Sequence, residues 1–295
     1  MNIGVIGMGV VGSAVYNAFE KKFPIAGYDK HKESDEFDAL LESDIVFLCV
    51  PTPTQMAKSG LMGFGTGQNL QAVYTSLAKL REKQYRGVVA LKSTVLPGTS
   101  KKLAKEHPDM IILSNPEFLN SRTANEEFEN CKKVLIGGDN SAGIELLVEA
   151  YKSLGVEKAI ITTHTEAETT KYVANVLGAV KVATANELYD VCKERKTNYQ
   201  LCADLAVEMT GWIHPEHLVV PFDGMLGLGG ECLPKDLQAI LCKNRHLQLF
   251  VLEAACRSTT HRRKGTKDFI PNRKNYKVVN LKPEPKRRQG RGRNN

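Results

Sequence analysis

The chain has 295 residues, of which 42% are hydrophobic and 25% are charged, as in ordinary globular proteins. This length allows two domains, and no apolar run is long enough to cross a bilayer. The N-terminus lacks the pattern of a secretory signal, and the seven cysteines include no CxxC pair. We therefore expect a cytoplasmic protein without membrane contact, disulfide framework or metal site.

The formal net charge of +7 is unevenly distributed along the chain. Residues 257–295 hold 14 Lys and Arg against 2 Asp and Glu, a balance of +12, which leaves 26 basic and 31 acidic residues, a balance of −5, for the first 256. We predict a disordered basic tail after a mildly acidic body. Such a tail offers nucleic acid a sequence-independent contact, although it carries no base-reading motif.

Seven short runs rich in β-branched residues alternate with helical periodicity in the first half of the chain. Near-continuous apolar runs suit strands that are covered on both faces, and helical connections between them indicate a parallel sheet. We predict an α/β, Rossmann-like, doubly wound and mostly parallel sheet over residues 1–163. The strands are expected at 1–7, 23–29, 43–50, 87–93, 109–114, 132–138 and 158–163.

The first expected strand leads into a glycine cluster, GMGVVG. Gly7, Gly9 and Gly12 form GxGxxG, which permits a tight turn, close backbone approach to a pyrophosphate and close helix–strand packing. Asp29 ends the second strand, where its carboxylate can accept from a ribose hydroxyl and would repel a 2′-phosphate. We prefer this interpretation to a plain turn with a surface aspartate, and NAD is the expected cofactor.

The pattern then becomes helical, which predicts an all-helical central domain over residues 164–256. Thr165 and Glu168 have the spacing of a capping box at the start of one long helix that runs to about Arg195. Its apolar stripe suits a dimerisation element, but the core of a monomer would produce one too. Further helical segments are expected over 197–211 and 235–256.

Cys232 lies in the stretch GLGGECLPKD. Glycines precede it, Pro234 suits the first turn of a helix, and a thiol at a helix N-terminus beside Lys235 would ionise more easily. Asp236 could then act as a general base or orient a water. A buried structural cysteine is the alternative, and these residues alone favour the reactive thiol only slightly. Three cysteines on apolar faces are expected to be buried: Cys49, Cys192 and Cys202.

Six separated motifs, in the same order, resemble those of the UDP-glucose/GDP-mannose dehydrogenase family. They are GMGVVG at 7–12, VPTPT at 50–54, KSTVLPGT at 92–99, NPEFL at 115–119, ETTKYVANVLGAVKVATANEL at 168–188 and GGECLPKD at 229–236. The resemblance covers nearly all of residues 1–240. It implies oxidation of the 6-hydroxymethyl group of a nucleotide sugar to a carboxylate, with two NAD and a covalent cysteine intermediate.

The resemblance also implies roles for individual residues. Cys232 would be the nucleophile and Asp236 its water-activating partner. Lys171 and Asn175, which share one helical face, would stabilise the developing oxyanion and hold a water. The catalytic set is completed by Thr94, implied to contact water and cofactor, and Glu117, implied to assist sugar chemistry and thioester hydrolysis. The implied cofactor contacts are Gly7, Gly9, Val10, Val11, Gly12, Asp29, Pro51, Thr52, Pro53, Thr94 and Lys235. The implied substrate contacts are Glu117, Phe118, Leu119, Lys171, Asn175, Phe222 and Gly229.

Three features depart from the family's pattern. The family continues into a second Rossmann-like domain that supplies much of the nucleotide-recognition surface, whereas about sixty residues follow Asp236 here. Ser121 stands where the family has a second glutamate, and Glu216 stands where an arginine reaches a neighbouring subunit's sugar. We therefore expect an altered substrate, or a partner chain that completes the pocket. The family also implies a homodimer through the helix at 166–195.

Two other functions stay open at the level of sequence. A hydroxyacid-type dehydrogenase would use the same dinucleotide fold and the Lys171/Asn175 pair in a single hydride step, and would release one NADH instead of two. A non-catalytic dinucleotide-binding relative would instead use the basic tail at 257–295 to contact nucleic acid.

Overall fold

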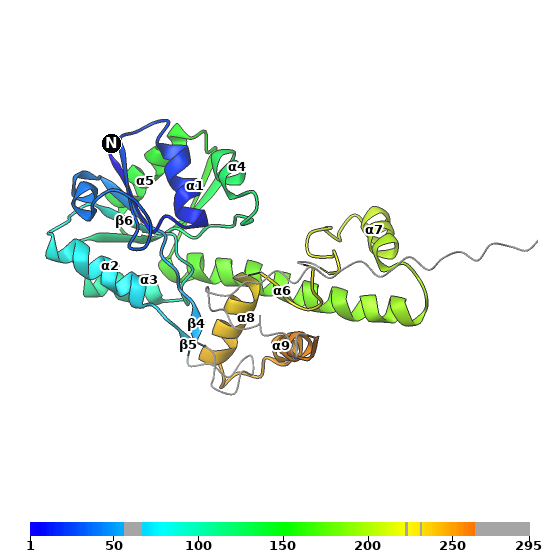
Figure 1. Ribbon diagram of the computed structural model, residues 1–295. Helices are drawn as coiled ribbons and strands as arrows, with labels where there is room; N and C mark the ends of the chain where they lie inside the picture. Colours follow the sequence, from blue (N-terminus) through cyan, green and yellow to red (C-terminus); the bar gives the residue numbers. More distant parts are fainter. Residues whose placement is uncertain (56–66, 222–223, 231, 263–295) are drawn as a thin grey trace, which may run out of the picture.

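The structure is a computed structural model, and it describes residues 1–55, 67–221, 224–230 and 232–262. The first part of the chain forms a sheet with helices on both faces. A helical part follows, arranged along one long helix (Figure 1). Phe222 and the tail from residue 263 onward lie outside the described residues. The substrate contact and the nucleic-acid contact expected there stay predictions.

A seven-stranded sheet confirms the predicted fold class. Its order is β2-β1-β3-β6-β7-β8-β9, so the direction of winding changes between β1 and β3. Every neighbouring pair is parallel except β7 and β8, which meet antiparallel at Ser114 and Gly137. All seven predicted strands are confirmed: β1 (Ile3–Ile6), β2 (Ile25–Tyr28), β3 (Ile45–Leu48), β6 (Val88–Leu91), β7 (Ile111–Ser114), β8 (Lys133–Gly137) and β9 (Lys158–Thr162).

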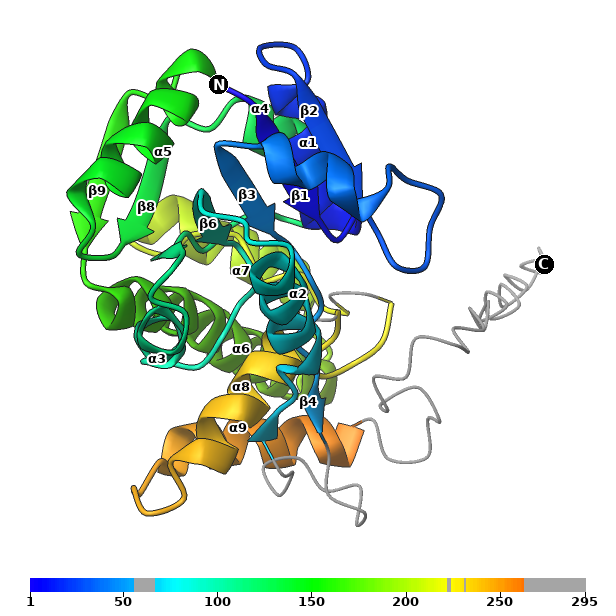
Figure 2. The ribbon, with the colours of Figure 1, turned by 90° about the vertical axis from the view of Figure 1, so that its left-hand side faces the viewer.

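Both faces of the sheet are buried, which explains why its strands read as continuous apolar runs. In β3, Phe47 packs into the core on one face, whereas Val46 and Leu48 pack into the core on the other. The first face is covered by α1 (Val10–Phe19), α4 (Ala124–Glu129) and α5 (Ser141–Ser153). The opposite face is covered by the 3-10 helix η1 (Phe37–Glu42), α2 (Gln71–Glu82) and α3 (Thr99–Glu106) (Figure 2).

A second, two-stranded sheet was not predicted. It pairs β4 (Thr54–Gln55) with β5 (Gly67–Gln68) in antiparallel register and lies beside α8 (Cys232–Lys243). Strands of two residues have no periodicity to detect, so sequence offered no signal for them. This small sheet links the end of the large sheet to the helical part.

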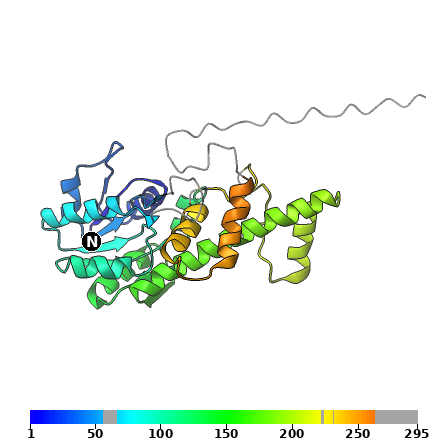
Figure 3. The same ribbon diagram turned by 90° about the horizontal axis from the view of Figure 1, so that it is seen from below.

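The helical part is organised around α6 (His164–Glu194), as predicted. The helix runs from the sheet to the far end of the molecule, where α7 (Tyr199–Thr210) packs on it (Figure 3). Between the sheet and α7, α8 and α9 (Phe250–Arg262) pack against α6 and share a core that includes Val182, Leu237 and Cys256. The described residues contain no helix that has both the length and the apolar character of a membrane span.

The capping box at the start of α6 differs from the prediction. Thr163 is the N-cap, its Oγ1 accepts from Glu166 N at 3.2 Å, and Glu166 Oε2 accepts from Thr163 N at 3.1 Å. The predicted pair of Thr165 and Glu168 is therefore wrong by two residues. Glu168 is instead buried against α3.

The end of the helical part also differs from expectation. The segment expected over 235–256 is two helices, because the chain leaves helical geometry between Lys243 and Phe250. The second of them, α9, continues six residues past Cys256, so the basic tail does not begin at Arg257. Thr259 is fully buried, and Arg262 pairs with Asp190 of α6 at 2.6 Å, which holds these residues in the helical part.

All seven cysteines are free thiols. Cys49 and Cys192 are partly buried, but Cys202 is exposed, so the expectation of burial is wrong for Cys202. It lies near one end of α7, whose Leu201, Leu205 and Met209 are also exposed. More than half of each apolar side chain is exposed at four positions of α6: Val173, Leu177, Leu188 and Val191. The homodimer expected through α6 stays a prediction.

Candidate active site

The glycine loop follows β1 at the point where the winding of the sheet reverses. Gly7 has φ +93°, and a Cβ there would lie 2.6 Å from the Cys49 carbonyl oxygen. A Cβ on Gly12 would lie 1.8 Å from the Gly7 carbonyl oxygen. A Cβ on Gly9 would meet nothing within 4 Å, so this glycine borders open space. The loop is thus tightly packed against the backbone at Gly7 and Gly12 and open at Gly9, where a ligand could approach the backbone closely.

The residues around this loop fit a dinucleotide. Gly9 is the N-cap of α1 and provides no side-chain cap, so the N–H groups of the first turn can face an anion. Val10 and Val11 follow it, and Val10 is exposed. Asp29 Oδ2 accepts from Met8 N at 2.8 Å, which places its carboxylate against the loop where a ribose would lie.

Two further loops meet at the same edge of the sheet. Pro51, Thr52 and Pro53 follow β3, and Thr94 follows β6. Thr52 Oγ1 donates to the Thr94 carbonyl at 2.6 Å. Thr54 Oγ1 donates to the Lys235 carbonyl in α8 at 2.9 Å, so the expected cofactor loops adjoin the cysteine-bearing helix.

A buried ion pair joins the sheet to α6. Lys171 Nζ lies 3.2 Å from Glu117 Oε1, and the two side chains are 5% and 9% exposed. Glu117 follows β7, and its Oε2 accepts from Leu119 N at 2.6 Å. The Lys171 ammonium also lies 5.3 Å from the centre of the half-exposed Phe118 ring. Because desolvating two charges is costly, these additional contacts matter for the stability of the pair.

A second charged cluster lies one helical turn further along α6. Asn175 Nδ2 donates to Asp236 Oδ2, and Lys235 Nζ donates to Asp236 Oδ1, both at 2.6 Å. Asp236 is fully buried, so each of its two oxygens has a partner in place of water. Its orientation is therefore fixed by one residue from α6 and one from α8.

Cys232 is the first residue of α8, so its predicted place at a helix N-terminus is confirmed. The residue as a whole is exposed, but protein surrounds enough of it that desolvation raises the pKa of the thiol. Lys235 and Lys171 act in the opposite direction, whereas Asp236 and Glu117 raise this pKa further. The prediction of easier ionisation is therefore wrong for the ligand-free protein. The four charges that act on the thiol are those of the two clusters just described.

Several residues of the site had no recognised role in the sequence. Gln68 of β5 donates to the Thr94 carbonyl at 2.7 Å and accepts from Leu96 N at 3.0 Å. Lys92 is buried beside Tyr151, whose hydroxyl lies 3.2 Å from Nζ, and burial lowers the pKa of Lys92 to about 8. Lys92 could have been noticed in the sequence because a lysine directly follows a buried apolar strand. No feature of the sequence marked Gln68. Gly229, an expected substrate contact, is buried shortly before α8.

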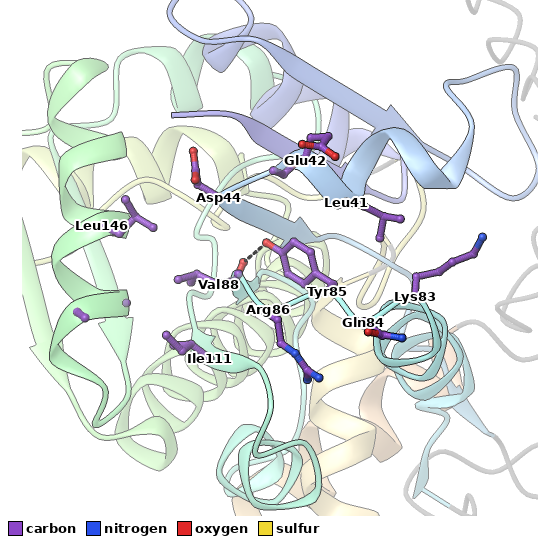
Figure 4. Close-up of a pocket in the computed structure, with 14 residues that line it drawn as sticks. Leu41, Glu42, Asp44, Lys83, Gln84, Tyr85, Arg86, Val88, Ile111 and Leu146 are labelled. Carbon is purple, nitrogen blue, oxygen red and sulfur yellow. Dashed lines mark hydrogen bonds between the residues drawn. The ribbon is translucent and has the colours of Figure 1, made fainter.

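A separate pocket of about 560 Å³ lies at the opposite edge of the sheet (Figure 4). Its lining includes Val88 and Ile111, the first residues of β6 and β7. The lining cations are already paired, Arg86 with Asp109 at 3.3 Å and Lys83 with Asp38 at 2.9 Å. The pocket is remote from the carboxyl ends of the strands, where the candidate site lies.

The fold and the glycine loop define a dinucleotide-binding protein, and the adjoining helical part brings a thiol and two charged clusters to its cofactor edge. The chain belongs to the UDP-glucose/GDP-mannose dehydrogenase family. The NAD binding domain of that family matches residues 26–155, and its central domain matches residues 165–259. The first of these matches confirms NAD as the expected cofactor.

Relatives agree with this assignment. The chain is 30% identical to GDP-mannose 6-dehydrogenase of Pseudomonas aeruginosa over 81% of its length and 56% of the relative. It is 32% identical to UDP-glucose 6-dehydrogenase of Rhizobium meliloti over 69% of its length and 46% of the relative. The chain thus spans about half the length of the curated relatives it matches.

Solved structures share the fold. A UDP-glucose dehydrogenase from Pyrobaculum islandicum superimposes with a TM-score of 0.74 at 24% identity, over 88% of this chain and 68% of that one. A GDP-mannose dehydrogenase from Pseudomonas aeruginosa gives 0.61 at 25% identity, over 89% and 69%. The described architecture is therefore that of the family.

Proposed function

We propose that this chain is an NAD-dependent dehydrogenase that oxidises the primary alcohol of a nucleotide sugar to a carboxylate through a covalent intermediate on Cys232. One observation carries the proposal: the Lys171–Glu117 pair and the Asp236 cluster both act on the Cys232 thiol, beside the cofactor loops. The names of the relatives, which act on UDP-glucose and GDP-mannose, support the substrate class.

The proposed reaction converts one alcohol, two NAD⁺ and one water into one carboxylate, two NADH and three protons. NAD held by the glycine loop and Asp29 would supply the hydride acceptor for both oxidation steps. Between these steps the Cys232 thiolate adds to the aldehyde carbon, and a C–S bond forms. Loss of the second hydride turns this adduct into a thioester. Water then breaks the C–S bond, which releases the carboxylate and restores the thiol.

Four residues of the two charged clusters have roles in this proposal. The Lys171 ammonium, whose charge acts on the thiol, and the Asn175 amide, which binds Asp236, would stabilise the oxyanion that forms when sulfur or water attacks. Asp236, held through both oxygens, would orient the hydrolytic water and accept its proton. Glu117 pairs with the Lys171 ammonium and would hold it in place.

Two positions of this chain differ from the family's pattern. Glu216 is exposed, and its Oε1 lies 3.8 Å from His217 Nε2, so it presents a carboxylate where the family presents an arginine. Ser121 is exposed in the turn that leads to α4. We infer that selectivity among nucleotide sugars differs from that of the relatives, or that a partner chain completes this half of the pocket.

A panel of nucleotide sugars tests the proposal. The purified protein is mixed with NAD and with UDP-glucose, GDP-mannose or UDP-N-acetylmannosamine, and NADH and sugar acid are both quantified. We expect two NADH for each carboxylate formed with at least one substrate. One NADH per product would indicate a single-step dehydrogenase. NAD binding without turnover of any panel member would favour the non-catalytic alternative.

A further inference from the structure

Helix α3 starts without a side-chain cap of its own. Its N-cap is Gly98, which has φ +91° and no side chain to accept from the first N–H groups. Glu168 of α6 supplies the acceptor: its carboxylate receives Gly98 N at 2.5 Å, Ser100 N at 2.7 Å and Ser100 Oγ at 2.6 Å. A carboxylate at this position also suits the positive end of a helix. Two helices from different parts of the chain are thereby joined.

Glu168 shares a face of α6 with the buried lysine of the site. Lys171 and Tyr172 follow it at i+3 and i+4, so the three side chains lie on one side of the helix. The Tyr172 hydroxyl lies 3.5 Å from Gln68 Nε2, which in turn donates to the Thr94 carbonyl. Contacts on either side of Lys171 therefore join α6 to the segment that follows β6.

Some of these groups line one small cavity. Its volume is about 10 Å³, close to the space of a single water, and Thr94, Glu168 and Lys171 are among the residues that line it. Glu168 is only 4% exposed, and Lys171 is equally buried. With so little free volume, a shift of α6 at Glu168 must move Lys171 as well.

We propose that Glu168 is a positioning residue that holds Lys171 against Glu117 by fastening α6 to the start of α3. The proposal rests on the proposed function for its catalytic consequence, but the placement of Lys171 is a property of the fold alone. In Glu168→Gln, the Gly98 and Ser100 donors would face an amide, which is a weaker acceptor than a carboxylate and has one acceptor oxygen in place of two. The first turns of α6 would then move away from α3. Lys171 would then lose its register with Glu117.

The test compares Glu168→Gln with Glu166→Gln. Glu166 is an exposed carboxylate near the start of the same helix that caps only α6 itself, so its variant is the matched control. We expect kcat of Glu168→Gln to fall roughly 10²-fold with little change in KM or in the Kd for NAD. Glu166→Gln should keep the wild-type kcat.

A second readout needs no substrate. The native proteins are labelled with an amine-reactive reagent, and modification of Lys171 and Lys92, both 4% exposed, is followed by peptide mass spectrometry. Faster labelling of Lys171 in Glu168→Gln, with Lys92 unchanged, supports a local displacement. Unchanged labelling of Lys171, a parallel rise at Lys92, or normal kcat in an active enzyme would overturn the proposal. If the wild type oxidises no sugar, the proposed function fails, and the labelling still decides the role of Glu168.

Discussion

Cys232→Ser is expected to abolish carboxylate formation and to leave NAD binding intact. Serine keeps the size of the side chain, but its hydroxyl ionises far less readily than a thiol and would be a poor leaving group during hydrolysis. Loss of a catalytic nucleophile costs on the order of 10⁶-fold in turnover. Carboxylate is quantified chromatographically, and NAD affinity is measured by calorimetry. The glycine loop lies in a different element from Cys232, so the Kd for NAD should not change.

Cys202→Ser provides the matched control. Cys202 is an exposed thiol near the start of α7, outside the candidate site, so its replacement should leave turnover unchanged. Carboxylate production at the wild-type rate by Cys232→Ser would exclude the covalent route. Equal loss of activity in both variants would point instead to a general requirement for thiols.

Lys171→Ala is expected to lower both stability and turnover. The variant leaves Glu117 buried and without its cation, which costs about 3–5 kcal/mol of unfolding free energy. It also removes the proposed donor to the oxyanion, and loss of such a donor typically costs roughly 10²–10³-fold in kcat. Urea unfolding gives the first quantity, and kcat at saturating substrate gives the second.

A double variant separates the two effects of Lys171. Lys171→Met combined with Glu117→Gln removes both charges and should recover much of the lost stability without recovering activity. Lys132→Ala, which breaks an exposed pair with Glu157, should change neither quantity appreciably. A Lys171→Ala protein as stable as the wild type would contradict the buried ion pair.

The sheet and the glycine loop were predictable because they depend on local sequence. Strands buried on both faces must be apolar at nearly every position, and β3 shows this with Val46, Phe47 and Leu48. Gly7 and Gly12 are required by contacts with nearby backbone atoms, so their spacing carries the signal. A helix start close to Cys232 was likewise indicated by the glycines before it and by Pro234, although the helix was expected from residue 235 and begins at Cys232.

The predictions that were wrong, and the site residue that was missed, depend on tertiary contacts. Thr163/Glu166 and Thr165/Glu168 have the same capping-box spacing, but Glu168 accepts from the start of α3, a tertiary contact that the spacing does not reveal. The pKa of Cys232 follows from how much protein surrounds it, whereas sequence shows only the helix terminus and Lys235. Gln68 joins the site through a two-residue strand that no periodicity reveals.

Trapping the acyl group on Cys232 tests the central claim most directly. Asp236→Asn should slow thioester hydrolysis, because the amide is a much weaker base, so the intermediate accumulates. The variant is mixed with NAD and the best substrate of the panel, quenched in acid, digested and analysed by mass spectrometry. The account predicts that the peptide containing Cys232 gains the mass of the oxidised nucleotide sugar, and that hydroxylamine removes it. Steady carboxylate production with this peptide unmodified throughout would contradict the account.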